Sequence, residues 1–558
     1  MKIAVLVSRA LPVVLVSLAM ALVGAPAAAA AQTSVIVGER TPSSAAAERL
    51  VERLGGHVGR QLSLVGGFAA TVPANRLEDL RRSRAVGSVY RNARLRPQTL
   101  PAGCDPTQPA CYDELPPELT WEGAVRLDQV PPKYKGDLVG VALIDTGVTP
   151  TADLGGRLLA RIDLTNERDG IDHYGHGSHM AGLIAGDGTQ AFGNYEGAAP
   201  EANLVSVKVA GWDGATDVST IIAGLQWAVS NRDRFGLRVV NLSYGTDSLQ
   251  AVDRDPLDFA VERAWRAGLA VVVSAGNDAG PVAKPGDDPF VITVGAADVN
   301  GTAGVADDTV AAFSSRGGGK PDVVAPGVSL ASIRAPGSTI DGLHPVARLG
   351  QWYFKGSGTS QAAAVVSGVI ARMLEANPAL TPDQIKGVLL ATANPALAGP
   401  GAGAGLVDAG AAVVRATPPK NGPAPTLPRA NLGAVASTGL GSIDGSRGTE
   451  GVVADLDGDG VPEPVVGEVD VLGRPWDAAA YVADPWTLAS FAASPWSAIS
   501  TVMAGNLATP DLAAAVGPRV AWEARHWGAR DWVTAGWDVQ LWSARHWGAR
   551  HWGAFSWR

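Results

Sequence analysis

The chain has 558 residues, of which 46% are hydrophobic and 18% are charged, and these values exclude a disordered protein. Its 45 lysine and arginine residues face 54 aspartate and glutamate residues, so the net charge of −9 excludes nucleic acid as the main partner. The length predicts about three to four structural units.

Residues 1–31 combine basic, apolar and small side chains in that order. Lys2 and Arg9 precede an apolar run over 10–23, and an alanine-rich stretch ends at Ala31. The apolar run is short for a membrane span and the small residues suit a cleavage site, so we predict a secretory signal and an extracellular location. A retained N-terminal anchor is the alternative.

Residues 32–100 alternate short segments typical of strands and helices. Strands are expected at 34–37, 57–64, 68–72 and 86–91, and helices at 44–54 and 75–82. The order βαββαβ predicts a small α+β open-faced sandwich. An independent binding domain would show the same composition.

A Pro-rich connector, residues 101–120, contains the two cysteines of the chain. Cys104 and Cys111 lack the CxxC spacing of a redox or zinc site. In an exported protein they are expected to form a structural disulfide.

Residues 121–416 alternate apolar runs with helical segments. The runs cover 138–144, 202–209, 237–242, 269–273 and 290–294. Because they are almost continuously apolar, they suit strands covered on both faces, and the region predicts an α/β fold with a mostly parallel, doubly wound sheet.

The first of these strands is followed by Asp145. Functional groups in such sheets gather beyond the carboxyl ends of the strands, although a lone aspartate there often only forms a turn. His176 and His179 follow in GHGSHMAG at the start of a helix of small residues. We expect His176 to act as a general base oriented by Asp145, and His179 to face the core, since a metal pair would need a third ligand.

The segment 356–373, GSGTSQAAAVVSGVIARM, predicts a buried helix with Ser360 at its entrance. The unpaired N–H groups and the dipole of a helix start favour negative charge, which suits a serine oxygen that becomes an alkoxide or an ester. The alternative is that Ser360 only caps the helix.

Residues 417–430 form a Pro-rich linker, and residues 431–558 differ sharply in composition. Of the 16 tryptophans, 11 lie after residue 470, with aromatic residues every five positions over 476–496 and 522–557. This period fits neither one face of a helix nor a flat strand. The rings could bind a glycan or cell-envelope surface, or pack against each other.

The loop DLDGDGVPE has the pattern of a calcium site. Asp455, Asp457, Asp459 and Glu463 stand at its first, third, fifth and ninth positions, whereas the twelfth position is Val466 in place of the usual glutamate. A structural calcium ion or an acidic turn are the two interpretations.

Asp145 in LIDTG, His176 in GHGSHMAG and Ser360 in SGTSQAA resemble the three catalytic motifs of the subtilisin-like serine proteases, in that family's chain order. The resemblance implies an endopeptidase that needs no cofactor for its chemistry. Asn277 in VVVSAGN would be the oxyanion asparagine. Gln361 and Ala364 depart from the residues usual in the family.

The resemblance also assigns roles outside the triad. Ser243, Tyr244 and Gly245 in VVNLSYG resemble the segment beside the backbone of a protein or peptide substrate. Residues 32–100 resemble an inhibitory propeptide, a partner cut from the enzyme between about Arg96 and Pro117. A Trp-rich tail of this kind resembles those of some exported actinobacterial members.

Three other classes compete with this interpretation. Serine-carboxyl peptidase relatives share the SGTS helix but use glutamate in place of His176. An α/β-hydrolase would need a GxSxG elbow, and residues 358–362 are GTSQA. A surface-binding protein on an inactive protease scaffold is the remaining alternative.

Overall fold

The computed structural model describes residues 32–40, 45–62, 67–91, 120–302, 304–421, 426–449, 452–457, 461–505 and 554–556. The chain forms two compact units, residues 1–97 and 98–558. The expected secretory signal, Cys104, Cys111, Asp459 and the side chains of the tryptophans beyond residue 505 lie outside the described residues.

The N-terminal unit has the predicted order of strands and helices. Its elements are β1 (Gln32–Glu39), α1 (Ala46–Arg53), β2 (His57–Leu62), β3 (Gly67–Pro73), η2 (Ala74–Arg76), α2 (Leu77–Arg81) and β4 (Val86–Arg91). The strands form an antiparallel sheet in the order β2-β3-β1-β4. Val35, Val37, Phe68 and Val72 point from alternate strand positions into a core that Val51 of α1 also enters, as the period of two requires.

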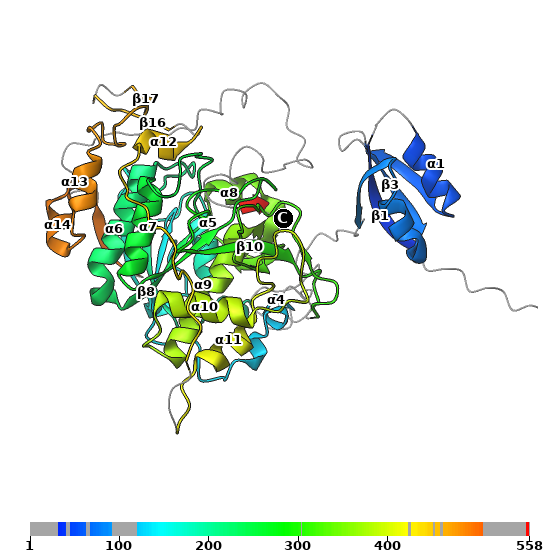
Figure 1. The fold of residues 1–558 in the computed structure, drawn as a ribbon, viewed down its shortest axis with the longest axis horizontal. Coiled ribbons are helices and arrows are strands. Elements are labelled where there is room, and N and C mark those ends of the chain that lie inside the picture. The colour runs from blue at the N-terminus through cyan, green and yellow to red at the C-terminus, as the bar shows by residue number, and fades with distance from the viewer. Residues whose placement is uncertain are drawn as a thin grey trace, which may run out of the picture. The chain divides into compact units, whose positions relative to one another are not determined.

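A nine-stranded sheet forms the centre of the second unit (Figure 1). Its strands are β5 (Gly140–Asp145), β6 (Leu158–Asp163), β7 (Asn203–Lys208), β8 (Leu237–Leu242), β9 (Ala270–Ser274), β10 (Ile292–Asp298), β11 (Thr309–Val310), β12 (Val323–Pro326) and β18 (Thr501–Ala504). The order is β11-β10-β9-β8-β5-β7-β6-β18, with β12 paired to β10. Only β11 and β18 run antiparallel to their neighbours, so the predicted mostly parallel sheet is confirmed.

Helices cover both faces of this sheet (Figure 1). Those of the sheet region are α5 (His176–Ala185), α6 (Val218–Phe235), α7 (Pro256–Arg266), α9 (Thr359–Ala376), α10 (Pro382–Thr392) and α11 (Ala409–Ala416). The helix α10 begins with a capping box, in which the Thr381 hydroxyl and the Gln384 side chain each accept the other residue's N–H.

Short elements complete the region between residues 120 and 358. They are α4 (Thr120–Ala124), η3 (Leu127–Gln129), η4 (Gly155–Arg157), η5 (Thr189–Ala191), β13 (Leu330–Ile333), α8 (Thr339–Leu343), η6 (Pro345–Ala347), β14 (Arg348–Leu349) and β15 (Tyr353–Gly358). The strands β13, β14 and β15 form a second sheet, which β19 (Ala554–Ser556) joins. Because β15 leads directly into α9, this small sheet positions the start of that helix.

The described residues between 426 and 505 belong to the same compact unit as the sheet. They include α12 (Ile443–Arg447), β16 (Val453–Ala454), β17 (Glu463–Pro464), α13 (Ala478–Ala483), α14 (Leu488–Ala493) and α15 (Pro495–Ile499). Trp486, Phe491 and Trp496 are buried in the core of the sheet unit, which removes these rings from the expected glycan surface.

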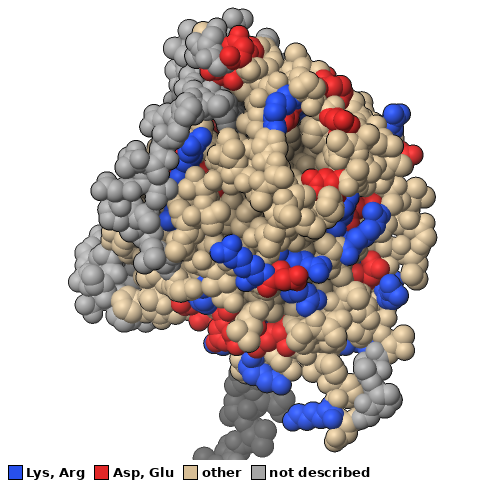
Figure 2. All heavy atoms as spheres, turned by 90° about the vertical axis from the view of Figure 1, so that its left-hand side faces the viewer, with Lys and Arg blue, Asp and Glu red and all other residues tan. Residues whose placement is uncertain are grey.

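The aromatic residues of 476–496 recur every five positions, and the helices here have only five or six residues with breaks between them. The chain can therefore turn successive rings toward the sheet unit. Tyr481, for instance, donates its hydroxyl to the Pro256 carbonyl and packs edge-on against Phe259 of α7. Basic and acidic side chains are interspersed over the described part of this face (Figure 2), so its charge is not gathered into one patch.

Candidate active site

Asp145 ends β5 at the carboxyl edge of the sheet and is fully buried. The carboxylate accepts the N–H of Thr146 at 2.8 Å, and the same loop turns at Gly147, whose φ is 106°. Burial raises the pKa of Asp145, and the nearby His176 and the Thr146 N–H oppose that rise. The carboxylate is therefore held in one orientation toward the imidazole.

His176 is the first residue of α5, and its Nδ1 lies 2.8 Å from Oδ1 and 3.0 Å from Oδ2 of Asp145. The flanking glycines make this approach possible. Gly175 has φ 110°, and a Cβ on Gly177 would lie 2.1 Å from the Gly147 carbonyl oxygen. The structure thus brings together the first two predicted site residues, with Nε2 of His176 turned away from the carboxylate.

His179, one turn further along α5, has a different environment. It is buried, and its Nε2 lies 3.1 Å from the Phe354 carbonyl oxygen. Burial and the neighbouring His176 lower the pKa of His179 to about 3, so this ring stays neutral. The expectation that His179 faces the core is confirmed.

Ser360 is the second residue of α9 and is buried. The cap position is occupied by Gly358, and no side chain caps this helix, so capping does not explain Ser360. The helices α5, which begins with His176, and α9, which has Ser360 in its first turn, pack against each other. The hydroxyl therefore lies at the positive end of a buried helix that contacts the helix of the imidazole.

Asn277 follows β9 and is fixed against the start of α9. Its Oδ1 accepts the N–H of Thr359 at 2.9 Å and the Thr359 hydroxyl at 3.1 Å. Among the described residues, its buried Nδ2 has no hydrogen-bond acceptor. A buried amide donor normally has a partner, so a donor left open next to Ser360 suits an oxygen supplied by a substrate.

Two residues that sequence reasoning missed hold this arrangement. The Asp172 carboxylate accepts the Thr146 hydroxyl at 2.8 Å and the Ser178 N–H at 2.7 Å, and so joins the Asp145 loop to α5. The buried Lys208 ammonium donates to the carbonyls of Thr146 and Ile171 at 2.7 and 2.9 Å. The proximity of Asp172 to His176 was a signal, but a lysine inside an apolar strand has no local pattern that shows its partners.

The predicted substrate segment, Ser243, Tyr244 and Gly245, directly follows β8 and is buried. The Ser243 hydroxyl lies 3.3 Å from the Asn241 amide nitrogen. At Thr246 the chain forms an antiparallel bridge to Lys284. The structure thus places the segment at the same carboxyl edge as Asp145 and Asn277.

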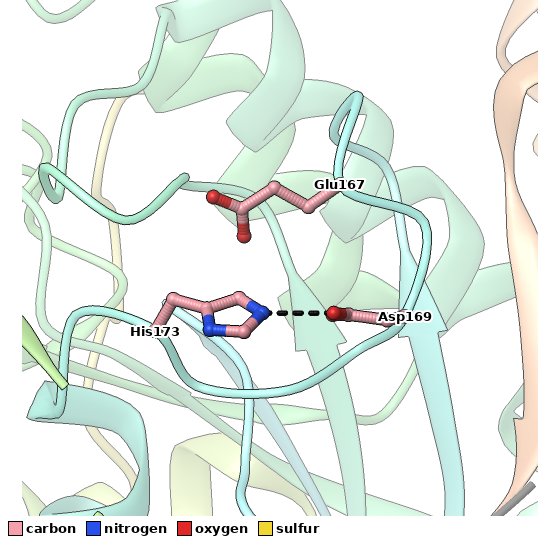
Figure 3. A group of neighbouring side chains, drawn as sticks. All are labelled: Glu167, Asp169 and His173. Atoms are coloured by element: carbon pink, nitrogen blue, oxygen red, sulfur yellow. Dashed lines mark hydrogen bonds and ion pairs between the residues drawn. The ribbon is translucent and has the colours of Figure 1, made fainter. Parts of the chain in front are cut away.

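Glu167, Asp169 and His173 form a carboxylate–imidazole group in the loop before α5 (Figure 3). His173 Nε2 lies 2.8 Å from Asp169, and this hydrogen bond raises the pKa of His173. Glu167 pairs with the Lys208 ammonium at 2.9 Å and accepts the Trp212 N–H at 2.8 Å. These contacts tie the loop to Lys208 and Trp212, so the group stabilises the conformation of the loop.

Asp455, Asp457 and Glu463 of the predicted calcium loop present carboxylate oxygens within 4.8 Å of one another. A set of hard oxygen donors at this spacing fits a calcium ion. Glu463 also accepts the Leu456 N–H at 3.1 Å. The twelfth position, Val466, is exposed and offers no ligand side chain.

Comparison with known proteins identifies the class. The chain is 44% identical over 268 residues to serine protease AprX of Bacillus subtilis, which covers 46% of this chain and 61% of AprX. It is 37% identical over 278 residues to subtilisin Savinase of Lederbergia lenta, covering 50% and 91%. To the minor extracellular protease Epr of Bacillus subtilis it is 32% identical over 267 residues, covering 46% and 36%. The fold and these similarities define the domain as that of a serine-type endopeptidase.

Residues 136–424, slightly more than half of the chain, match the sequence profile of the subtilase family. The chain belongs to the subtilase family. Members of this family need no cofactor for catalysis. Within the described residues, none of the helices has the length and apolar character needed to cross a bilayer.

Proposed function

We propose that the chain is an exported serine endopeptidase that is made as a zymogen and cleaves peptide bonds through Asp145, His176 and Ser360. The observation that carries the proposal is the buried pair of Asp145 and His176 Nδ1 at 2.8 Å. A carboxylate on Nδ1 keeps the proton there and leaves Nε2 as the base.

The proposed reaction has two halves. In the first, Ser360 Oγ attacks the scissile carbonyl while His176 Nε2 takes the hydroxyl proton, and that proton then passes to the leaving amine. In the second, water attacks the acyl-enzyme ester and gives a proton to His176 Nε2, which passes it to Ser360 Oγ as the ester bond breaks and the acid leaves. Asp145 stabilises the imidazolium in both halves.

Asn277 is proposed to stabilise the negative oxygen of each tetrahedral intermediate. Its Oδ1 is bound to Thr359, so its Nδ2 is the group left to donate, together with the backbone N–H of Ser360 at the helix start. Ser243 to Gly245 would pair with the substrate main chain, which gives affinity with little demand on sequence.

The zymogen proposal rests on the N-terminal unit. Residues 1–97 form a compact unit of their own with a complete antiparallel sheet and core. A unit of this kind is suited to an inhibitory propeptide that is cut off between about Arg96 and Pro117. Export is supported by the basic, apolar and small-residue order of residues 1–31 and by the similarity to a protease named as extracellular.

Two further functions of the C-terminal region remain proposals. Asp455, Asp457, Asp459 and Glu463 would hold a structural calcium ion through carboxylate oxygens. The tryptophans of 522–557 would contact a glycan or cell-envelope surface, whereas Trp486 and Trp496 are buried against the sheet unit.

The peptidase proposal is tested with Ser360→Ala. This variant should lose hydrolysis of a denatured protein, labelling by a fluorophosphonate and removal of residues 32–100, while its circular dichroism spectrum is unchanged. Ser367→Ala is the matched control, because Ser367 is a buried serine of the same helix whose hydroxyl donates to the Asn241 side-chain oxygen at 2.9 Å. Hydrolysis retained by Ser360→Ala would refute the assignment, and an unlabelled wild-type chain would favour an inactive scaffold.

A further inference from the structure

The C-terminal strand β19 lies next to the start of the candidate active-site helix. Ser556 pairs with Ser357, and Ala554 pairs with Gly358, in antiparallel register. Gly358 is followed by Thr359 and Ser360, and β19 also contacts α9. Residues almost two hundred positions after Ser360 therefore return to within two residues of it, and the red segment marks them in Figure 1.

The end of β15 is a fixed template for such a strand. On one side, the Gly358 N–H donates to the Gly327 carbonyl at 2.8 Å, and the Ser357 hydroxyl accepts the Ser329 N–H at 2.8 Å. Earlier in β15, residues 353–356 pair with β13. An extended peptide can add to the remaining edge through main-chain hydrogen bonds, which place little demand on its side chains.

The candidate reacting groups are covered in this arrangement. Ser360 and His176 are both 0% exposed, and Asn277 is 3% exposed. A peptide carbonyl must approach Ser360 Oγ closely, so a covering segment has to leave before a substrate can bind. Among the described strands, β19 pairs with β15 directly before Ser360 through only two residue pairs, and 48 residues separate it from the preceding described residue, Gly505.

We propose that the strand β19, residues 554–556, is an intramolecular ligand of the β15 edge that competes with an extended polypeptide substrate on one side of Ser360. The proposal rests on the proposed peptidase function for its consequence, but the docking itself does not. Tethering raises the effective concentration of a segment to about the millimolar range, so even a weak strand pairing can compete.

Docking is tested by amide hydrogen exchange in the full chain with Ser360→Ala, which prevents self-cleavage. Adding Ser556→Pro removes a main-chain donor from β19, whereas Ser556→Ala keeps it and is the matched control. Exchange in the peptide covering 353–360 should become about tenfold faster with Ser556→Pro and stay unchanged with Ser556→Ala. Equal exchange in all three chains would overturn the proposal, as would protection that increases with protein concentration, which would assign the strand to a second copy.

Competition is tested in the active chain by ending it at Gly553. For an internally quenched peptide that extends several residues beyond the cut bond, KM should fall about threefold to tenfold, with kcat unchanged. A peptidyl p-nitroanilide, whose leaving group is small, should show a smaller change. The nonapeptide of residues 550–558 should restore inhibition, and its analogue methylated at the Ser556 nitrogen should not.

These results separate the two proposals. An unchanged KM for the long peptide would overturn competition while leaving the peptidase assignment intact. If a fluorophosphonate labels neither chain, the peptidase assignment fails, and the exchange experiment still decides whether the strand is docked.

Discussion

Two buried polar networks in this unit use similar groups and differ in whether their donors are satisfied. Arg447 donates to Asp217 at 2.7 Å and to the Gly467 carbonyl at 2.9 Å, and so ties α12 to the start of α6. At the candidate active site, by contrast, Asn277 has its oxygen bound and its nitrogen without an acceptor among the described residues. We call the Arg447 network closed, because its donors are satisfied, and it stabilises the fold. The Asn277 network is open, because its amide nitrogen stays available for a reacting oxygen.

The largest effect is expected for Asp145→Asn at the candidate active site. The new amide can donate to His176 Nδ1, which forces the ring proton onto Nε2 and removes the base. We expect kcat to fall about 10⁴-fold, the size established for this change in serine proteases with such a triad. A loss below tenfold in the kcat of purified protein would contradict the role of Asp145.

Arg447→Met tests the closed network. It leaves the buried Asp217 carboxylate without its main partner and should lower the free energy of unfolding by about 3–5 kcal/mol. Denaturant titration measures this change, and kcat per folded molecule should stay within about twofold of wild type. Arg429→Met is the matched control, because its pair with Asp383 is exposed and spans 3.4 Å, so about 1 kcal/mol or less is expected.

Asn277→Ala tests the open network. Removing the donor should lower kcat by about 10²–10³-fold with little change in KM, since the negative oxygen forms only during the reaction. Asn277→Asp keeps an oxygen for the Thr359 N–H and lacks the donor, so it should show at least as large a loss. Activity retained by the aspartate variant would assign the effect to the Thr359 contact instead.

The smallest expected effect is on the free energy of unfolding at low pH, through the hydrogen-bonded carboxylate of Asp341. Burial alone would raise the pKa of Asp341, but hydrogen bonds from Arg334, the Gly337 N–H and Arg348 outweigh it and lower the pKa from 3.8 to about 2. The lowered folded-state pKa means that its contribution, about 2 kcal/mol, is present above pH 4 and lost as the pH falls toward 2.

Asp341→Asn should therefore flatten the loss of unfolding free energy between pH 4 and pH 2. Urea titrations at pH 5 and pH 2.5 measure the difference between wild type and variant. The exposed Asp233, whose side chain is 91% accessible, gives the control Asp233→Asn. An equal acid slope in all three proteins would refute the assigned contribution of Asp341.

Local sequence patterns predicted much of the central sheet. The runs expected at 202–209 and 237–242 became β7 (Asn203–Lys208) and β8 (Leu237–Leu242). A strand buried on both faces consists almost entirely of apolar residues, so it can be recognised in the sequence without knowledge of the neighbouring strands. Strand β6 was missed because the charged residues Arg161 and Asp163 interrupt its apolar run. Arg161 is buried against the distant Gly505 carbonyl, and Asp163 accepts N–H groups of the loop that follows the strand.

For the candidate site, the sequence by itself determined the order and local setting of Asp145, His176, Asn277 and Ser360, because each follows a recognisable strand or begins a helix. Only the tertiary structure decided that Asp172 and Lys208 hold the site and that the aromatic segment 476–496 packs on the sheet unit. It also decided that β18 and β19 return to the two sheets. Helix and strand periodicity depends on near neighbours, whereas the partner of a buried charge or an open sheet edge is chosen among residues distant in the chain.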